Sequence, residues 1–582
     1  NNLFFPAPNG VYVYNSLADF YTAANDALDN PTGTMSPVQY ERFQFRYSAL
    51  PGAALPLQVL KAHRVDLYGQ DNFRVSDNFN VLFGVRLGTF FFENTALENS
   101  AITAMDFIDI DENRGYQINT GNMPSTQILW EPRLGFNWDV SGNKTLQFRG
   151  GTGIFTGRPP YVWLSNQIGN NGVLTGFIDD RGKTTYPFRP DASVFIPSTP
   201  TLPSTFDIAV ADEDYKFPQV WKSNLAVDYK LPLGLIATVE FLYNKNINSV
   251  LYFDANLEPS NGTLNGPDKR PRFLGNGNPS RINDNVSRAA VLTTTNEGYY
   301  AGASFKLEYP SSKGLYAMAA YTYSRAKDLM GAGSIASGSW TSARSINGNN
   351  NLELSYADFD IPHRITGLLG YRLSYGNSFF GATGLSLGYV GDKSRAVGFN
   401  GISFAAAGDL NQDGVQNNDL IYVPNSANEL QFEQFTSGGK TFTVADQIAA
   451  FDAFIDQDEY LSTRRGMYAE RNGRVLPWLH RFDLSVTQDF GLLIGGKRHS
   501  IQFRADILNV GNLFNDEWGV GNTLITDRPL TYRSLDANGT PVYRFATQVI
   551  DGETQMLRNT FVPSTSPSNV WTAQFGLRYT FE

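Results

Sequence analysis

One pattern recurs along most of this chain: apolar or aromatic residues alternate with polar ones over stretches of about ten residues. The C-terminal stretch VWTAQFGLRYTFE (570–582) shows it most clearly. Its odd-numbered residues, from Trp571 to Phe581, are apolar or aromatic, and the residues between them are small, polar or charged. A strand of this kind has one face for an apolar environment and one for a polar environment. In a soluble sandwich the apolar face is the core, whereas in a membrane barrel it is the outside.

The same alternation marks several further segments, and their polar faces carry full charges. They include residues 79–91, 128–139, 225–231, 365–375 and 501–507. A soluble strand can also have a charged outer face. The alternation alone therefore does not decide between the two environments.

The connections between these segments are more decisive, because short and long ones alternate strictly. The short ones are rich in turn-forming residues and lie at 75–78, 140–144, 231–234, 309–314, 374–378 and 491–499. The long ones are polar and irregular and lie at 93–126, 156–217, 247–290, 327–362, 392–479 and 512–566. Short periplasmic turns and long extracellular loops are typical of outer-membrane barrels, and a compact soluble domain rarely holds so many long loops. The sequence therefore predicts an all-β fold, a transmembrane antiparallel β-barrel with long extracellular loops.

The number of strands predicts that this barrel is incomplete. Roughly 13 strands are clear, and about two more are predicted before residue 60, at 11–14 and 40–48. Bacterial barrels usually have an even number of strands, about 22 in the large plugged transporters. An unclosed edge in lipid would leave backbone groups unsatisfied. We expect residues 1–582 to be the C-terminal part, with about 15 strands, of a barrel of about 22 that begins upstream of Asn1; strands hidden in the long loops are the alternative.

Composition excludes several classes of protein. The net charge of −10 argues against a nucleic-acid partner, and the absence of cysteine excludes disulfides and cysteine-based chemistry. No apolar run approaches the roughly 20 residues of a membrane-spanning helix. The four histidines lack metal-protease spacing, and no nucleophile elbow or phosphate-binding loop occurs. We therefore predict that the chain is not an enzyme and binds no organic cofactor.

Five stretches carry a resemblance in combination: NFNVLFGVRLG (78–88), LQFRGGTGIFTGRPPYVWLSNQ (146–167), YADFDIPHRI (356–365), FRADILNVGNLFN (503–515) and FGLRYTF (575–581). Together they resemble the TonB-dependent outer-membrane receptors, in particular the large Oar-like members found in Bacteroidota, which are Gram-negative. The resemblance implies a multi-pass outer-membrane receptor with a periplasmic C-terminus. It also implies an N-terminal plug and a TonB box upstream of Asn1, through which an energy-coupling complex would drive uptake of a large nutrient such as a glycan, peptide or chelate.

The resemblance leaves other uses of the barrel open. A non-transport scaffold, or a secretion or adhesion partner, would have an occluded lumen and stable envelope partners. An unplugged diffusion channel would conduct ions. Besides outer-membrane lipid, a surface lipoprotein lid is an expected partner, since many large relatives work with one.

The segment GDLNQDGVQNNDLIY (408–422) is the most specific local motif. It resembles the start of an EF-hand-type calcium loop, in which alternate oxygen ligands surround a glycine. The predicted ligands are Asp409, Asn411, Asp413, the carbonyl of Val415, Asn417 and Asp419. Leu420 stands where the closing glutamate belongs, so a metal-free, Asx-rich turn is the alternative. A second cluster, Asp106, Asp109, Asp111 and Asn113, is better interpreted as a solvated loop.

Two further groups of residues are candidates for ligand or plug contacts. Tyr161 and Trp163 could stack on a ligand in the vestibule, although packing against loops or a place in the aromatic girdle is favoured. Polar-face residues are predicted to face the lumen and grip a plug. They are Arg86, Arg133, Arg149, Arg364, Arg504, Asp506 and Arg578.

Overall fold

The computed structural model describes residues 7–157, 160–198, 206–275, 280–376, 379–394, 396–397, 400–495 and 497–581. Parts of the predicted segments lie outside these residues. They are Arg158 and Pro159 of the 146–167 motif, Asn377 and Ser378 of one turn, Gly496 of another, Glu582 at the end, and residues 199–205, 276–279, 395, 398 and 399 of the long connections.

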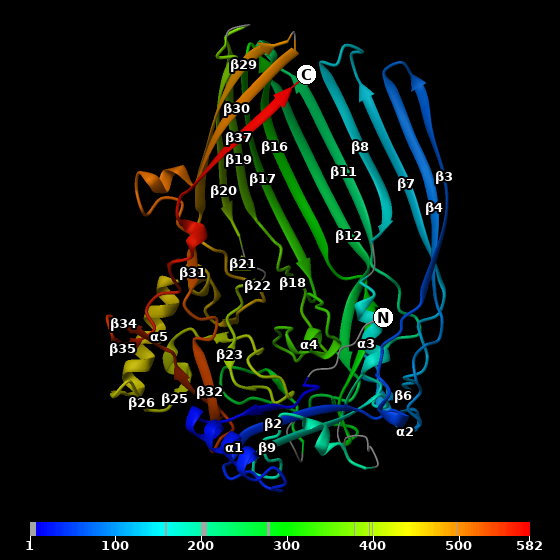
Figure 1. Cartoon of the computed structure of the whole chain (residues 1–582), viewed down its shortest axis with the longest axis vertical. Helices are drawn as coiled ribbons and strands as arrows, with labels where there is room; N and C mark the ends of the chain where they lie inside the picture. Colours follow the sequence, from blue (N-terminus) through cyan, green and yellow to red (C-terminus); the bar gives the residue numbers. More distant parts are fainter. Residues whose placement is uncertain are drawn as a thin grey trace.

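The largest sheet of the described residues has sixteen strands, and its main path is antiparallel (Figure 1). Within the described residues, thirteen of its strands follow one another in chain order, each paired with the next. They are β3 (Ala62–Ser76), β4 (Phe79–Phe92), β7 (Gln127–Asp139), β8 (Leu146–Thr156), β11 (Gln219–Lys230), β12 (Ile236–Asp254), β16 (Tyr299–Ser312), β17 (Leu315–Asp328), β19 (His363–Ser374), β20 (Ala382–Lys393), β29 (Leu479–Ile494), β30 (Lys497–Leu508) and β37 (Thr572–Phe581). Three more strands join it off this path: β10 (Phe206–Ala211), β15 (Val286–Thr295) and β18 (Ser355–Tyr356).

All short turns lie at one end of this sheet and all long connections at the other, as Figure 1 shows. The connection between β3 and β4 spans two residues, whereas that between β20 and β29 spans residues 394–478. This arrangement confirms the predicted fold class and the predicted alternation of turns and loops. Because outer-membrane barrels have their long loops outside the cell, the end with long loops is called the extracellular end.

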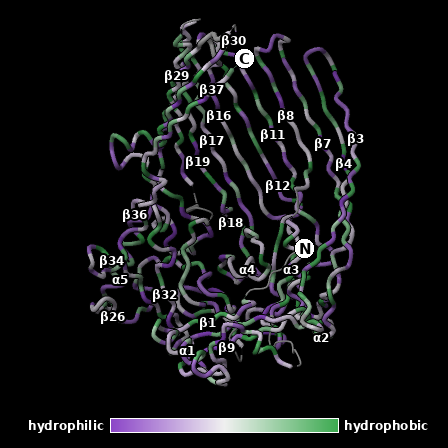
Figure 2. Tube along the Cα trace, in the orientation of Figure 1, coloured by the Kyte–Doolittle hydropathy of each residue, from purple (hydrophilic) through white to green (hydrophobic). Residues whose placement is uncertain are grey.

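The register of the sheet separates the two faces that the alternation predicts. Phe305 of β16 lies opposite Val239 of β12 on one side and opposite Tyr321 of β17 on the other, so large apolar residues share one face. In Figure 2 the hydropathy alternates along the strands. This apolar face is uncovered: the Leu577 side chain is 75% exposed. Large exposed apolar residues in continuous rows fit a surface that meets lipid rather than water.

The apolar face has the height of a membrane. Tyr299 and Tyr309 both lie on it in β16, ten residues apart. At a rise of about 3.3 Å per residue and a tilt of about 40°, this separation corresponds to about 25 Å across the membrane. That is about the height of the apolar band between the two aromatic girdles of an outer-membrane barrel.

The two outer strands of the path are β3 and β37, and no pairing joins them within the described residues. β3 runs from the end with long loops toward the end with short turns, and β37 runs in the same direction (Figure 1). None of the described helices is long and apolar enough to cross a membrane.

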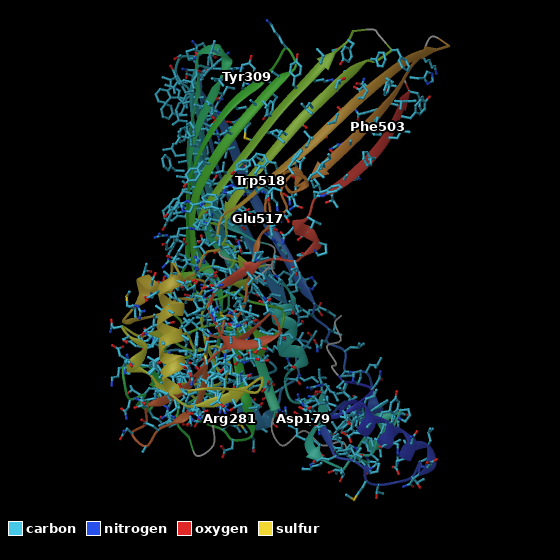
Figure 3. All side chains as sticks on the ribbon, turned by 90° about the vertical axis from the view of Figure 1, so that its left-hand side faces the viewer. Asp179, Arg281, Tyr309, Phe503, Glu517 and Trp518 are labelled. Carbon is cyan, nitrogen blue, oxygen red and sulfur yellow. The ribbon has the colours of Figure 1, made fainter. Side chains whose placement is uncertain are left out.

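The two strands predicted before residue 60 do form, but they belong to another sheet. β1 (Val11–Val13) and β2 (Tyr40–Ser48) pair with each other, and β2 pairs with β9 (Thr175–Lys183) of a later loop. With helix α1 (Leu17–Asp29) they form a small module that projects from the loop end, marked by Asp179 in Figure 3. Phe43 and Tyr40 are fully buried in its core. A local alternating pattern does not distinguish the apolar core of such a module from lipid.

The long connections are folded, not irregular. Their largest apolar core contains Phe404, Phe451, Phe454 and Phe545. Their helices are α2 (Ser100–Thr103), α3 (Val162–Gly169), α4 (Ala336–Thr341) and α5 (Val444–Gln457). Their main additional strands are β23 (Ala406–Ala407), β32 (Leu530–Leu535), β33 (Pro541–Phe545) and β25 (Gln431–Phe432), which make one sheet in that order. Smaller hairpins are β5 (Phe107–Ile108) with β6 (Arg114–Tyr116), β26 (Phe435–Ser437) with β27 (Lys440–Phe442), β31 (Asn522–Leu524) with β36 (Phe561–Pro563), and β34 (Thr547–Ile550) with β35 (Glu553–Met556).

A charge placed on each face of one strand tests the assignment of the faces. Phe305 lies near the middle of the apolar band, so Phe305→Arg should cost about 2–4 kcal/mol of folding free energy. Ser304→Arg, on the polar face of the same strand, should cost less than about 1 kcal/mol. Both free energies are measured by urea unfolding of the full-length protein in lipid vesicles. Equal costs, or a larger cost for Ser304→Arg, would contradict the assignment.

Candidate functional site

The folded loops enclose a polar cleft with a volume of about 540 Å³. Three long connections contribute to it: 329–362, 394–478 and 509–571. The lining residues that carry charge or a side-chain amide are Arg344, Asp358, Gln416, Asn417, Asn418, Arg471, Asn472, Asp527 and Arg528. A volume between roughly 300 and 1,000 Å³ is typical of sites that bind small molecules.

Three ion pairs of arginine residues lie in the walls of the cleft. Arg344 bonds to Asp527 at 2.7 Å through Nη2 and donates through Nη1 to the carbonyl of Asn417 at 3.1 Å. Arg471 pairs with Asp328, at the extracellular end of β17. Arg528 lies 3.5 Å from Asp527, and its side chain is 43% exposed. Of these guanidinium groups, that of Arg528 is the most available to a ligand.

The cleft therefore presents three guanidinium groups against the two carboxylates of Asp358 and Asp527. Arginine recognises carboxylate and phosphate groups through paired hydrogen bonds. The arrangement suits a polar ligand with an anionic group. Sequence reasoning missed these residues, because they lie in segments without periodicity and meet only through the packing of distant loops.

The predicted calcium loop forms one wall of the cleft and turns tightly, as Gln412, Gly414 and Asn417 all have positive φ. Its side chains accept backbone hydrogen bonds from within the loop. Asp413 Oδ1 accepts from the Val415 amide at 2.9 Å, and Asn417 Oδ1 accepts from the Gly408 amide at 3.0 Å. These contacts are those of an Asx-rich turn.

The carboxylates of Asp409, Asp413 and Asp419 in this loop lie close enough for their negative charges to interact. Burial, reinforced by the charge of Asp419, raises the pKa of Asp409 to about 7 and that of Asp413 to about 8. Burial also raises the pKa of Asp419, although Arg270 opposes this effect. Oδ1 of Asp409 is buried without a hydrogen-bond partner. A proton or a cation would relieve this concentration of negative charge.

Within the part of the chain that the structure describes, no group of three or more His, Cys, Asp or Glu side chains is arranged to hold a metal ion. Asn411 and Asp419 are buried with their oxygens bonded to backbone amides of the loop. The calcium site over Asp409–Asp419 stays a prediction, and ion binding would require these carboxylates to converge.

A buried arginine holds the calcium-like loop to the rest of the extracellular domain. Arg270 is 1% exposed and bonds to Asp268 at 2.9 Å and to Asp419 at 3.2 Å. Its Nη2 also donates to the Leu420 carbonyl at 2.5 Å, and the Tyr468 hydroxyl donates to Asp268 at 2.9 Å. The sequence gives no sign of this network, since Arg270 and Asp419 are far apart along the chain.

The other predicted sites have simpler surroundings. Trp163, in α3, packs against the apolar core beneath it and donates from Nε1 to the Gly333 carbonyl at 2.8 Å. Tyr161 precedes this helix, 37% exposed, with its ring edge-on to Phe217. In the second acidic cluster, Asp109 Oδ1 accepts from the amides of Asp111 and Asn113, and Asp106 accepts from Gln117. These contacts agree with loop packing at Trp163 and with a solvated turn at Asp109.

The seven residues predicted to face the lumen all lie on the polar face of the sheet. Several pair with each other or with acids on the same face: Arg86 with Asp66, Arg149 with Asp228, and Arg504 with Asp506. Arg133 lies over the Phe155 ring. Arg364 is opposite Thr322, and Arg578 is opposite Gln502. Their contact with a plug stays a prediction.

The fold, the short-turn and long-loop ends and the uncovered apolar face define an outer-membrane type of β-barrel. Residues 9–523 match the family described as an outer membrane beta barrel domain. The chain belongs to this family, and it is an outer-membrane protein. No curated protein matches the chain.

Solved structures of outer-membrane receptors and transporters show a distant likeness. The siderophore receptor PirA from Acinetobacter baumannii is 10% identical, with a TM-score of 0.36, and the match covers 81% of this chain and 46% of that one. The outer membrane transporter YddB from Escherichia coli is 10% identical, with a TM-score of 0.36 and coverage of 93% and 55%. The copper transporter OprC is 10% identical, with a TM-score of 0.35 and coverage of 93% and 52%. The chain spans about half the length of these proteins.

Calcium should stabilise the extracellular domain if the loop 409–419 binds it. At a concentration a hundred times the dissociation constant, bound calcium would add about 2.7 kcal/mol. We expect the melting temperature of the full-length protein to rise with calcium but not with magnesium, and the rise to disappear in Asp413→Asn. Asp109→Asn, in the other acidic cluster, should retain it. The melting temperatures of the unmodified protein and of the two variants are measured by near-UV circular dichroism during heating, with and without a chelator. A melting temperature unaffected by calcium would refute the site.

Removal of the buried arginine should destabilise the same domain without calcium. Arg270→Met leaves the carboxylates of Asp268 and Asp419 buried and unpaired, which costs about 3–5 kcal/mol. Arg114→Met breaks an exposed pair with Glu258 and should cost less than about 1 kcal/mol. Hydrogen exchange of the loop segments in the folded barrel reports the difference. Equal protection in the two variants would show that the network contributes nothing to stability.

Proposed function

We propose that this chain is the C-terminal barrel and extracellular domain of a TonB-dependent receptor that takes up a large polar nutrient. The observation that carries the proposal is the polar cleft that three loops build at the extracellular end of an outer-membrane barrel. A structural scaffold has no need of a preformed cleft lined by arginine, amide and hydroxyl groups. Among the nutrients that the family resemblance implies, the charge of the cleft favours those with anionic groups, such as a peptide carboxylate or an acidic chelate.

The sheet supports a larger barrel in the complete protein. The outer edges of β3 and β37 would be unsatisfied in lipid, and we therefore infer further strands between them. β3 starts at the extracellular end, so a strand preceding it in the chain would run toward that end. If the barrel begins at the periplasmic side, the number of additional strands is odd and the total is even, as bacterial barrels require. Nine more strands would give about 22.

Because β3 starts at the extracellular end, residues 9–61, which precede it, have an expected place in the complete barrel. They would be the last part of one more extracellular loop, whose strands β1 and β2 pair with β9 of a later loop. The C-terminus of β37 lies at the end of the sheet with the short turns, which supports a periplasmic C-terminus (Figure 1). A plug would fill the lumen against the charged polar face, and its TonB box would engage the energy-coupling complex.

A non-transport scaffold or secretion partner is the alternative, and uptake measurements separate the two. A strain lacking the gene would be complemented with the full-length protein and grown on oligopeptides, oligosaccharides or ferric chelates as sole sources. Growth that depends on the protein and on the energy-coupling complex supports transport. Normal growth of the deletion strain on every source, with an envelope protein bound stably to the loops, would overturn the proposal.

The cleft predicts which loop arginine such uptake needs. Arg528→Ala removes the most available guanidinium of the cleft and should weaken binding of the identified nutrient about tenfold, or about 1.4 kcal/mol. Arg533→Ala is a matched control, because its side chain is also 43% exposed but pairs with Glu433 outside the cleft. Binding is measured by titration calorimetry on the purified full-length protein. Unchanged affinity in Arg528→Ala, or an equal loss in Arg533→Ala, would exclude the cleft as the binding site.

A further inference from the structure

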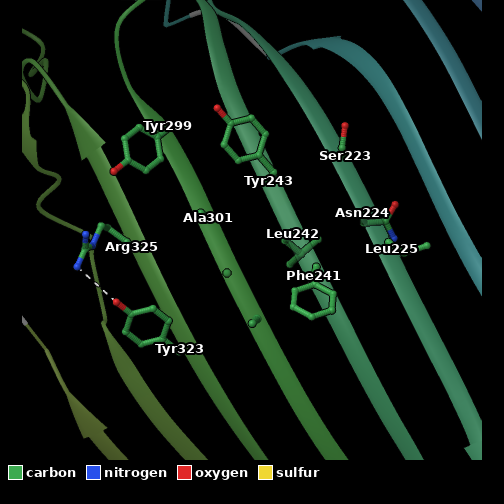
Figure 4. A pocket seen from close by; sticks show the side chains of 12 residues that line it. Ser223, Asn224, Leu225, Phe241, Leu242, Tyr243, Tyr299, Ala301, Tyr323 and Arg325 are labelled. Carbon is green, nitrogen blue, oxygen red and sulfur yellow. Dashed lines mark hydrogen bonds between the residues drawn. The ribbon is translucent and has the colours of Figure 1, made fainter.

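A groove with a volume of about 590 Å³ lies on the lipid-facing surface, across strands β11, β12, β16 and β17 (Figure 4). Most of its lining residues lie on the apolar face of the sheet, opposite the face that carries the residues predicted to face the lumen. The strand register places the residues of the groove in rows that run across the four strands. Leu225, Phe241, Ala303 and Tyr323 lie side by side in one row. The next row toward the extracellular end is Ser223, Tyr243, Ala301 and Arg325.

Two small residues produce the depression. Ala301 and Ala303 of β16 form its floor, whereas aromatic side chains of β12 and β17 stand on either side. Phe241 is 57% exposed, and Tyr323 is 41% exposed. In Figure 4 the aromatic rings of Phe241 and Tyr243 lie on one side of β16, and Tyr323 lies on the other. An apolar groove of this volume in contact with membrane hydrocarbon has the polarity to hold a lipid acyl chain.

The extracellular end of this groove is basic. The row above Arg325 consists of Trp221, Lys245, Tyr299 and Lys327, adjacent in register. Lys327 lies over the Tyr356 ring at 4.7 Å, and Arg325 donates to the Tyr323 hydroxyl at 3.4 Å. Among the described residues, neither cation has a carboxylate within ion-pair distance, and Lys245 approaches Glu297 only at 4.0 Å.

The height of this basic row matches that of lipid headgroups. Tyr299 belongs to the aromatic girdle at the extracellular boundary of the apolar band, about 25 Å from Tyr309. Lys327, in the same row, and Arg325, in the neighbouring row, therefore lie where the phosphates of the outer leaflet lie. Basic side chains at this level attract anionic headgroups, by about 1 kcal/mol for each Lys or Arg near the surface.

We propose that this groove is a specific binding site for a membrane lipid of the outer leaflet that carries phosphate groups. One acyl chain lies along Ala301 and Ala303 between the aromatic walls. The phosphate lies at Arg325 and Lys327, with Lys245 at its edge, and the tyrosine hydroxyls donate to its oxygens. The site needs both features, since the cations select the headgroup and the groove orders the chain. It rests on the barrel and its orientation in the membrane, and not on the transport proposal.

The test uses the full-length protein in detergent micelles and native mass spectrometry. Phosphatidic acid is the phosphate-bearing probe, and phosphatidylcholine with the same acyl chains is the comparison. We expect the unmodified protein to retain one phosphatidic acid molecule at least tenfold more tightly than phosphatidylcholine. An equal affinity for the two lipids would overturn the proposal.

Three variants separate the headgroup site from the groove. The double substitution Arg325→Gln with Lys327→Gln should reduce the preference to less than twofold. Ala303→Phe fills the groove and should weaken binding of both lipids while the preference remains. Lys393→Gln is the matched control, because Lys393 lies on the same face at the extracellular end of β20, and it should behave as the unmodified protein. A loss of preference in Lys393→Gln equal to that in the double variant would refute a local site.

Two further measurements test whether misfolding or simple anion binding explains the result. Heat-dependent mobility on gels establishes that each variant barrel is folded before its lipid binding is compared. Inorganic phosphate in excess should not displace phosphatidic acid, because a free anion lacks the acyl chain. Displacement by inorganic phosphate would show a simple anion site and overturn the assignment to a lipid.

Discussion

The structure depends on one constraint: inside a membrane, each backbone amide and carbonyl must find its partner in a neighbouring strand. Except at the outer edges of β3 and β37, the thirteen-strand path meets this requirement almost without interruption. Its register shifts occur between Gln219 and Val220, between Tyr309 and Ser312, and between Arg74 and Ser76. All three lie at strand ends, where water is available. Bulges, which leave a residue unpaired, are thus confined to the rims of the sheet.

The same constraint places apolar side chains outside in the membrane sheet and inside in the folded loops. In the sheet, large apolar side chains such as Phe575 and Leu577 are exposed, because lipid takes the place of a core. Beyond the membrane the loops meet water, so Phe451, Phe454 and Phe545 are buried and charged groups must be paired. The Arg270 network shows the consequence. Two carboxylates and a guanidinium are buried together, which is tolerable only because each has several hydrogen-bond partners.

The strands and turns of the barrel could be predicted from the sequence because their signal is local. A two-residue period and a turn-forming cluster are each contained in a short segment, so β37 and the turn before β4 are recognisable alone. The extracellular domain has no such signal. Arg344 meets Asp527, and β23 pairs in parallel with β32, through contacts between loops far apart along the chain. Even a local pattern fails where two environments share it: β2 alternates like a barrel strand, yet its apolar side chains, including Phe43, fill a small water-exposed module.

The two environments meet at the extracellular end of β17, and the alternation of that strand joins two candidate sites. Arg325 and Lys327 lie on the lipid-facing side, next to the groove. Between and after them, Ala326 and Asp328 lie on the opposite side, where Asp328 pairs with Arg471 in the wall of the cleft. Because successive residues of a strand point to opposite faces, a shift of one residue here would exchange the two sets. The pairing of β17 with β18, through Lys327 and Asp328, fixes this register, so the same hydrogen bonds hold the lipid-facing cations and the wall of the cleft in place.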